Sequence, residues 1–320
     1  MTEIVPGIHR IESILGPRPF SQYLLRAERT LLVDTGIAST PDEVILPFFA
    51  AHGLDPADLD YVLLSHADVD HFGGNAAIRA AAPRAILCAH AQDAAWIGDR
   101  ERILRERYGW YAVHGAGADY DDATKAWLWD ALGPDVAVDL ELQGGEHFRL
   151  GPDVQVEVLH LPGHSPGHVG LWHEATGTAI VTDAVLGAGL LDMAGTIIHP
   201  PPYVDIAAYE ATIAKLQELQ PQRLLTAHYA PMEGEQATAF LRESAAFVER
   251  TRAAVAAAVR RSGTATLGGL LADLNPALGP FTSMANELAG PVRAHLDELV
   301  AAGKAELVDG SAPPSWRWVG

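Results

Sequence analysis

Residues 63–74, LLSHADVDHFGG, place two histidines and two aspartates within six positions, between an apolar run and a glycine pair. Imidazole nitrogens and carboxylate oxygens are the side-chain donors that bind divalent metal ions. Taken alone, this cluster is also consistent with an acidic surface loop, because the chain holds 41 Asp and Glu and 14 His. The rest of the sequence must therefore decide between the two interpretations.

Three later segments end in residues of the same types. His164 follows a Pro-Gly turn in HLPGHSPGH, Asp183 closes the apolar run AIVTDAV, and His228 closes RLLTAHYAP. Any one of them, taken singly, is more typical of a cap or a turn. Together with the first cluster they would bring imidazoles and carboxylates from four strand-end loops to one place, which is what a site for two metal ions requires.

The segments around these residues alternate between strands and helices. LDYVLLS (59–65) has the length and β-branched content of a buried strand and delivers His66 at its carboxyl end, and GGNAAIRAAA then begins a helix. RTLLVDTG is an apolar strand that leaves its sheet through Asp34, Thr35 and Gly36. The cluster at 66–71 is therefore predicted to lie in a strand-to-helix loop, where α/β proteins usually place their chemistry.

Length and composition limit the classes of protein to consider. The 320 residues, 48% of them hydrophobic, suffice for one large α/β domain with a smaller appendage. Because there is no apolar run of about 18 residues and no signal-peptide pattern at the start, we expect no membrane partner and a cytoplasmic location. Cys88 is the only cysteine, which excludes an internal disulfide and a cysteine-based metal cluster.

The formal net charge of −19 argues against nucleic acid as a partner. The acidic excess lies in residues 1–240, and such a surface repels phosphate backbones unless a basic patch overrides it. RERILRER (100–107) is the densest basic stretch, and its interleaved glutamates predict a solvated helix instead of such a patch.

Two regions differ in character from the rest. Residues 92–133 are predicted to be helical and are rich in tryptophan and tyrosine, so they form either a lid over the site or a packing or dimer interface. Residues 236–320 contain three Ala- and Leu-rich helical segments, at about 236–261, 266–274 and 285–302, followed by two short strands. Three helices and a hairpin predict a winged-helix-like domain, here without net charge.

In order and spacing, the ligand-type residues resemble the metal-binding motifs of the metallo-β-lactamase superfamily. They are His66, Asp68, Asp70, His71, His164, Asp183 and His228. The resemblance extends over residues 1–235 and includes the turn at 34–36. It implies an α/β fold, the αβ/βα sandwich of that family. Residues 92–133 would be an insertion in this fold, and they form its lid if they fold over the site. Residues 236–320 resemble the winged-helix-like C-terminal domain carried by one branch of the family.

The resemblance also implies two divalent metal ions with a defined set of ligands. One ion would take His66, Asp68 and His164, the other Asp70, His71 and His228, and Asp183 would bridge them. A bridging hydroxide would be the nucleophile, because metal binding lowers the pKa of water from 15.7 toward roughly 7. Asp70, beside that nucleophile, is the expected catalytic residue that orients it and moves a proton.

Asp68 stands where hydrolytic members of the superfamily usually have histidine. With Asp68, two divalent ions, three aspartates and a hydroxide sum to a neutral core, whereas histidine would leave one positive charge. Zinc is the expected metal, and the hard carboxylate oxygen makes iron or manganese the alternatives. A carboxylate at this position also resembles the diiron, oxygen-reducing branch, which usually has glutamate there.

The sequence therefore predicts a binuclear metal-dependent hydrolase of small esters, thioesters or lactones. The aromatic residues of 92–133 suit an apolar or aromatic substrate, and Trp96, Trp110 and Tyr229 are the expected pocket residues. The alternative is a diiron or dimanganese oxygen-linked redox protein, which would need a separate reductase because this chain has no flavin domain and no cysteine pair. A nuclease is a third hypothesis, opposed by the acidic charge. The sequence also allows a homodimer formed through the aromatic segment 92–133.

Overall fold

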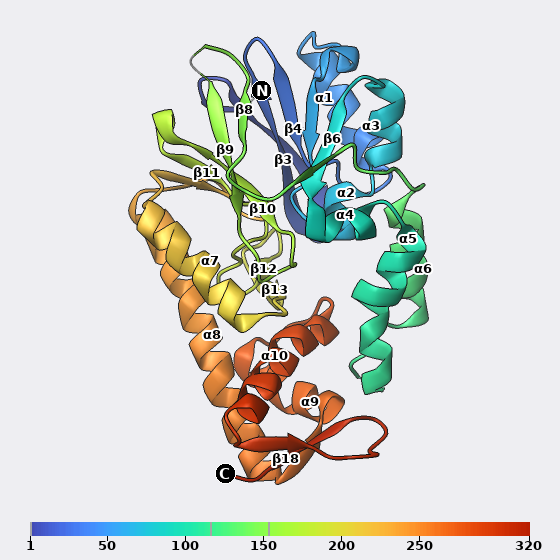
Figure 1. Cartoon of the computed structure of the whole chain (residues 1–320), viewed down its shortest axis with the longest axis vertical. Helices are drawn as coiled ribbons and strands as arrows, with labels where there is room; N and C mark the ends of the chain where they lie inside the picture. The colour runs from blue at the N-terminus through green and yellow to red at the C-terminus, as the bar shows by residue number, and fades with distance from the viewer. Residues whose placement is uncertain (1, 116, 153) are drawn as a thin grey trace.

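Two β-sheets packed face to face form the centre of the computed structural model, which describes residues 2–115, 117–152 and 154–320 (Figure 1). The seven-stranded sheet contains, in order, β1 (Thr2–Val5), β2 (Ile8–Leu15), β3 (Arg18–Arg26), β4 (Thr30–Val33), β5 (Tyr61–Leu63), β6 (Ile86–His90) and β7 (Leu140–Leu142). The six-stranded sheet contains, in order, β15 (Met232–Glu233), β14 (Arg223–Leu225), β11 (Thr178–Ile180), β10 (Val169–His173), β9 (Gln155–His160) and β8 (His147–Arg149).

The apolar residues of the strands explain why both faces of each sheet are covered. In β4, Leu31 and Val33 belong to the core between the two sheets, whereas Leu32 belongs to the core beneath the helices. Successive side chains of a strand point to opposite faces, so an uninterrupted apolar run needs a partner layer on each side. The expected αβ/βα sandwich is therefore confirmed.

Helices lie on the outer face of each sheet (Figure 1). A helical turn at Pro41–Ile45 continues into α1 (Leu46–Ala51), and α3 (Asn75–Ala81) and α4 (Ala91–Ile97) follow on the same side. The helix α7 (Ile206–Leu219) lies on the six-stranded sheet. Asp205 caps its N-terminus, because its side chain accepts a hydrogen bond from the Ala208 amide. Among the described residues, none of the helices combines the length and apolar character needed to cross a membrane.

The aromatic-rich region forms a series of short helical segments on one side of the sandwich. They are α5 (Arg100–Ile103), the turns Leu104–Tyr108 and Gly109–His114, and α6 (Asp122–Leu132). The small ribbon of β12 (Leu190–Leu191) and β13 (Ile197–His199) lies between the sandwich and the C-terminal elements in the view of Figure 1. The ribbon was not expected from the sequence.

The C-terminal region consists of three helices and a three-stranded antiparallel sheet (Figure 1). The helices α8 (Glu235–Ser262), α9 (Leu267–Leu278) and α10 (Ala289–Ala301) occur where the sequence predicted helices. The sheet joins β17 (Ala305–Leu307) and β18 (Ser315–Trp318), the expected pair, to a third strand, β16 (Thr264–Thr266), which was not expected. The winged-helix-like interpretation of this region stays a prediction.

Candidate metal centre

The carboxyl ends of several strands meet at one edge of the sandwich. Because β10 is antiparallel to both β9 and β11, and β11 is parallel to β14, the strands β9, β11 and β14 end at the same edge. The segments that follow the strands supply His164 after β9, Asp183 after β11, His228 after β14 and His66 after β5, while the short helix α2 (Val69–Phe72) supplies Asp70 and His71. Asp34, after β4, and Thr182, beside Asp183, adopt positive φ angles of 66° and 45°. Such backbone strain in non-glycine residues is typical of functional sites.

These side chains form two adjacent groups. One consists of His66, His164 and Asp183, and the other of Asp70, His71 and His228; within each group, one ligand atom per residue lies within 4.8 Å of the others. Asp183 also contacts the second group, since its Oδ2 is 3.3 Å from Nε2 of His71 and 3.2 Å from Nε2 of His228. Asp183 thus has the position of a residue that two metal ions could share.

Each of the four histidines uses Nδ1 for a contact with the protein framework. The partners are Ser65 Oγ for His66 (3.0 Å), the Asp34 carboxylate for His71 (2.7 Å), the Pro202 carbonyl for His164 (2.5 Å) and the Pro19 carbonyl for His228 (3.0 Å). Contacts of this kind fix the orientation and the tautomer of an imidazole. They leave Nε2 of every ring directed toward the carboxylates of the two groups, where it could bind a metal ion.

The unpartnered atoms and the charges of the site fit divalent cations. Nε2 of His66, Nε2 of His71 and Oδ1 of Asp183 are buried and have no hydrogen-bond partner among the described residues. Burial lowers the pKa of His66 to about 3, assisted by His71, so its ring is neutral, as a metal ligand must be. Burial would lower the pKa of His71 too, but Asp34, Asp183 and Asp70 raise it well above its ordinary value. This surplus of carboxylates would stabilise a bound cation.

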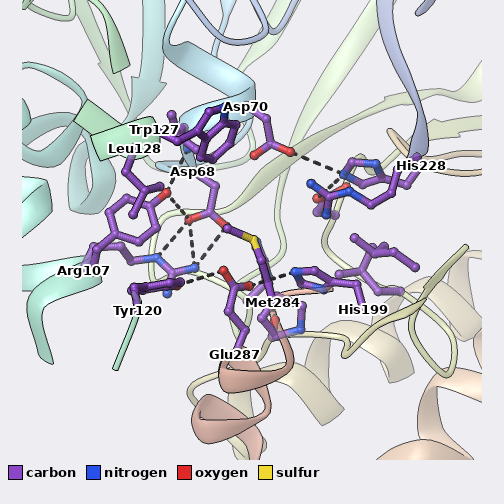
Figure 2. Close-up of a pocket in the computed structure, with 18 of the residues that line it drawn as sticks. Asp68, Asp70, Arg107, Tyr120, Trp127, Leu128, His199, His228, Met284 and Glu287 are labelled. Atoms are coloured by element: carbon purple, nitrogen blue, oxygen red, sulfur yellow. Dashed lines mark hydrogen bonds and ion pairs between the residues drawn. The ribbon is translucent and has the colours of Figure 1, made fainter. Parts of the chain in front are cut away.

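Asp68 lies beside the first group but is held by an arginine. Its Oδ2 is 2.9 Å from Nε2 of His164 and 3.5 Å from Nε2 of His66. Arg107 donates two hydrogen bonds to the same carboxylate, from Nε at 3.1 Å and from Nη2 at 3.0 Å (Figure 2). Burial alone would raise the pKa of Asp68, but the charge of Arg107, the hydrogen bond from His164 and the nearby ring of His66 hold it well below the usual range. Asp68 is therefore ionised, and its charge is balanced by a protein cation.

Arg107 corrects one expectation from the sequence. The stretch 100–107 was predicted to be a solvated helix, and Arg102 and Arg105 are indeed exposed. Arg107, by contrast, is only 7% exposed and points at the candidate metal centre. The stretch changes from α-helix to a wider helical turn at Leu104, so simple helical spacing did not predict which arginine faces inward.

Two buried aspartates support the loops of the site without belonging to either group. Asp34 accepts hydrogen bonds from the Ser65 amide (2.7 Å) and from Nδ1 of His71. Asp93 accepts hydrogen bonds from the Ala67 amide (3.0 Å), the Ser165 hydroxyl (2.6 Å) and the Gly167 amide (2.8 Å), so it joins the loops that carry His66 and His164. The sequence marked Asp34 only as part of a turn, and it gave no signal for Asp93.

A cavity of about 40 Å³ opens onto both groups, and its walls include the segment 92–133, the C-terminal region and His199 at the end of β13 (Figure 2). The segment 92–133 contributes aromatic and apolar side chains, namely Tyr108, Tyr111, Tyr120, Trp127 and Leu128, together with Arg107. The C-terminal region contributes Met284 and Glu287. Glu287 accepts a hydrogen bond from the Tyr120 hydroxyl (2.8 Å) and lies 3.2 Å from Nε2 of His199. It therefore connects the C-terminal region to the segment 92–133 and to β13.

The three residues expected to form the substrate pocket do not line this cavity. Trp96 and Trp110 line a neighbouring pocket of about 250 Å³, which shares Arg107 and His164 with the cavity. The hydroxyl of Tyr229 donates a hydrogen bond to the Leu186 carbonyl (3.2 Å) and packs near the cavity wall without lining it. Spacing in the sequence could not show which aromatic residues of a series of short helices face inward.

Comparison with known proteins points to one family. A family model described as the metallo-beta-lactamase superfamily matches residues 15–228. An acyl-coenzyme A thioesterase from Gallus gallus is 29% identical over 203 residues, which are 60% of this chain and 64% of that protein. A hydroxyacylglutathione hydrolase from Methylococcus capsulatus is 28% identical over 131 residues, which are 41% of this chain and 36% of that enzyme. The chain thus spans less than two thirds of these relatives.

Solved structures extend the likeness of fold to the C-terminal region. A metallo-beta-lactamase family protein from Thermus thermophilus superposes with a TM-score of 0.75 at 19% identity, and the match covers 99% of this chain and 100% of that one. A beta-lactamase domain protein from Burkholderia ambifaria gives a TM-score of 0.75 at 20% identity and covers 99% of this chain and 93% of that one. The three helices and small sheet after residue 235 are therefore part of an architecture found in other proteins.

Proposed function

The chain belongs to the metallo-β-lactamase superfamily, and from this premise we propose that it is a binuclear metal-dependent hydrolase of small esters, thioesters or lactones. The observation that carries the proposal is the pair of ligand groups that meet at Asp183, with all four histidines held through Nδ1. The names of the relatives, a thioesterase and a hydrolase of a glutathione thioester, favour thioesters within this class.

We assign the ligands according to the two groups. His66 and His164, with Asp68 beside them, would hold one ion, and Asp70, His71 and His228 the other, while Asp183 would serve both. When bound, two divalent ions supply a water of lowered pKa and polarise the carbonyl oxygen of the substrate. We propose zinc as the metal, with iron or manganese as alternatives. The balance of the Asp68 charge by Arg107 makes that carboxylate a weaker anionic ligand, which reduces its preference for the harder ions.

The residues around the cavity have separate tasks in this reaction. Hydrolysis adds the oxygen of water to the carbonyl carbon and breaks the C–S or C–O bond, and the thiol or alcohol leaves with a proton. Asp70 lines the cavity next to His228 (3.7 Å) and is the residue placed to accept the proton from water and pass it on. Tyr111, Trp127 and Leu128 exclude solvent and offer an apolar surface to a small acyl group.

The organisation of the chain belongs to the same proposal. We assign the catalytic domain to residues 1–235, a winged-helix-like domain to 236–320, and a lid to residues 92–133. Hydrogen bonds from the lid support this assignment, because Arg107 reaches Asp68 and Tyr120 reaches Glu287 in the C-terminal region.

Metal analysis together with kinetics tests the proposal. Protein purified without added metal should contain close to two equivalents of metal per chain. It should hydrolyse a panel of chromogenic thioesters, esters and lactones, lose that activity on treatment with a chelator, and regain it with zinc. One equivalent or less, or hydrolysis that a chelator does not affect, would rule out the binuclear mechanism. Asp183→Ala should lower the metal content of both groups, and a variant that kept two equivalents would contradict the shared position of Asp183.

The ionised carboxylate of Asp68 supports a second candidate function, that of an oxygen-linked diiron or dimanganese protein. In that case the native metal would be iron or manganese. The protein would consume oxygen when supplied with a chemical reductant, and hydrolysis of the panel would be absent. Oxygen electrode measurements on the same preparation distinguish the two candidates.

A further inference from the structure

Arg18 is a buried cation in the cavity wall without a partner. It is 9% exposed, its Nε is shielded from solvent without a hydrogen-bond partner, and its side chain forms no hydrogen bond or ion pair with a described residue. Among the other charged residues of the wall, Asp68 pairs with Arg107, and Glu287 contacts His199 and Tyr120. Asp70 and Asp183 belong to the two ligand groups. Shielding Nε from water without a partner is costly, so a counter-charge from outside the chain that reached this guanidinium would stabilise it.

The backbone holds Arg18 in a fixed place. It begins β3, directly after the turn that joins β2 to β3, where Leu15 pairs with Arg18. Gly16 in this turn has φ +58°, and the Pro17 carbonyl accepts a hydrogen bond from the Met193 amide (3.0 Å) beside β12. A side chain on such an anchored hairpin is preorganised for binding, because little ordering remains to be done when a ligand arrives.

Arg18 also lies where the cavity meets a larger opening. Besides the 40 Å³ cavity, it lines an open groove of about 390 Å³ together with Asp121, Trp127 and Met284. Arg18 therefore borders both hollows, and a substrate that entered the cavity from the groove would contact this guanidinium.

We propose that Arg18 binds a carboxylate carried by the substrate, so that the protein selects acidic thioesters or esters over neutral ones of equal length. The proposal rests on the proposed hydrolase function and specifies its substrate class. A guanidinium recognises a carboxylate through two parallel hydrogen bonds, which gives both charge and directional selectivity. Arg18 thus acts as a specificity-determining residue.

Matched thioesters test this selectivity. On the acyl side, glutaryl is compared with pentanoyl, both joined to the neutral thiol N-acetylcysteamine. On the thiol side, 3-mercaptopropionate, which is anionic, is compared with N-acetylcysteamine, both carrying a pentanoyl group. Spontaneous hydrolysis is subtracted from every rate. If the wild type shows a higher kcat/KM for the acidic compound in the acyl-side comparison, Arg18 contacts the acyl group. If it does so in the thiol-side comparison, Arg18 contacts the thiol half of the substrate.

Substitution of Arg18 should abolish that preference. We expect Arg18→Met to lower kcat/KM for the preferred acidic thioester by about 10- to 100-fold, and to change that for the neutral partner by less than about threefold. Arg18→Lys should retain part of the preference, because it keeps the charge but loses the paired geometry. Arg29→Met, which removes an exposed arginine that contacts Tyr61, is the control and should leave all rates unchanged.

Binding measured by calorimetry separates this inference from the hydrolase function. Metal-loaded protein is titrated with glutarate and with pentanoate, which share one carboxylate and differ in the second. Wild-type protein should bind glutarate at least about tenfold more tightly, and Arg18→Met should remove the difference. Equal affinities, or equal kinetic losses for acidic and neutral thioesters, would overturn the proposal even if hydrolysis is confirmed. If no thioester is hydrolysed, the proposed function fails while the titrations still decide the role of Arg18.

Discussion

The carboxylate of Asp68 is the point at which a single residue determines the charge of the candidate metal centre. It accepts two hydrogen bonds from Arg107 and lies 2.9 Å from Nε2 of His164. An aspartate without Arg107 would add a full negative charge beside the ligand group, whereas the pair adds almost none. The charge of Asp68 is therefore compensated within the protein by a residue from the segment 92–133.

We predict that Asp68 and Arg107 depend on each other for stability. Removing one member of a buried ion pair leaves an uncompensated charge, so Arg107→Met should lower the free energy of unfolding by about 3–5 kcal/mol. Asp68→Asn should also destabilise, and the double variant should lose clearly less than the sum of the two. Urea unfolding of the metal-free protein measures these values without a contribution from metal binding.

The matched control lies in the same segment. Arg102 pairs with Glu106 at 3.0 Å, but the two side chains are 44% and 37% exposed. An exposed pair of this kind contributes about 0–1 kcal/mol, so Arg102→Met should have a small effect. Strictly additive losses for Asp68 and Arg107 would mean that the two residues do not stabilise each other.

Side chains with metal-binding chemistry were predictable from the sequence, and the atoms that orient them were not. All seven predicted ligand residues lie at one sheet edge, because each follows a recognisable strand or begins a helix. The partners of Nδ1 in His164 and His228 are the carbonyls of Pro202 and Pro19. Every residue has a carbonyl, so no residue type in the sequence distinguishes these two. Arg107 was missed for another reason, because its direction depends on a change of helical pitch.

At the scale of elements, α2 and α6 approach each other through Gly73. A Cβ atom added at Gly73 would lie 2.1 Å from the Ala131 carbonyl oxygen and 2.8 Å from the Val69 carbonyl oxygen. The Ala131 carbonyl is itself held by the Ala38 amide at 2.8 Å. The end of α2, which carries two of the ligand residues, therefore fixes the position of α6, which carries Trp127 and Leu128 into the cavity.

Gly73→Ala should consequently act as a wedge between these two helices. We predict a loss of about 1–3 kcal/mol in the free energy of unfolding, which is typical of an overpacked contact. Gly98→Ala is the control, because its added Cβ would lie 3.4 Å from the nearest atom, and it should change stability by less than about 1 kcal/mol. Urea unfolding measures both, and a Gly73→Ala protein as stable as Gly98→Ala would show that α6 can move away at little cost.

The sequence predicted the main elements well and the small ones poorly. Long apolar strands and amphipathic helices such as α7 and α8 carry a periodic pattern, which depends on burial. The ribbon of β12 and β13, with two and three residues, is too short to have such a pattern. β16, with three residues, is set by its pairing with β18, which lies far along the chain.

At the scale of the whole molecule, buried polar contacts join the C-terminal helices to the sandwich. His295 on α10 is 1% exposed, and its Nε2 accepts a hydrogen bond from the hydroxyl of Tyr203, which precedes α7. Its Nδ1 donates a hydrogen bond to Glu298 at 3.2 Å. Both ring nitrogens are therefore in use while the ring is neutral, and protonation would remove the acceptor for Tyr203.

This contact makes the stability of the protein depend on pH. Burial lowers the pKa of His295 to about 4; Glu298 and, more weakly, Glu249 oppose the shift, whereas Arg252 adds to it. In the unfolded chain the group titrates near its ordinary value of 6.5. Between these values the unfolded state binds a proton that the folded state does not. The contribution of the neutral His295 ring to the free energy of unfolding is therefore fully present above pH 6.5, and it is lost as the pH falls toward 4.

We predict that the wild-type protein loses about 3 kcal/mol of its free energy of unfolding from this group between pH 6.5 and 4. His295→Gln keeps polar atoms but cannot titrate there, so its stability should fall less steeply over the same range. The difference between the two proteins, measured by urea unfolding at successive pH values, should shrink or reverse as the pH falls. His147→Gln, at an exposed histidine of β8, should follow the wild-type curve. Parallel curves for wild type and His295→Gln would mean that His295 takes up a proton in the folded protein without weakening the junction of the C-terminal helices with the sandwich.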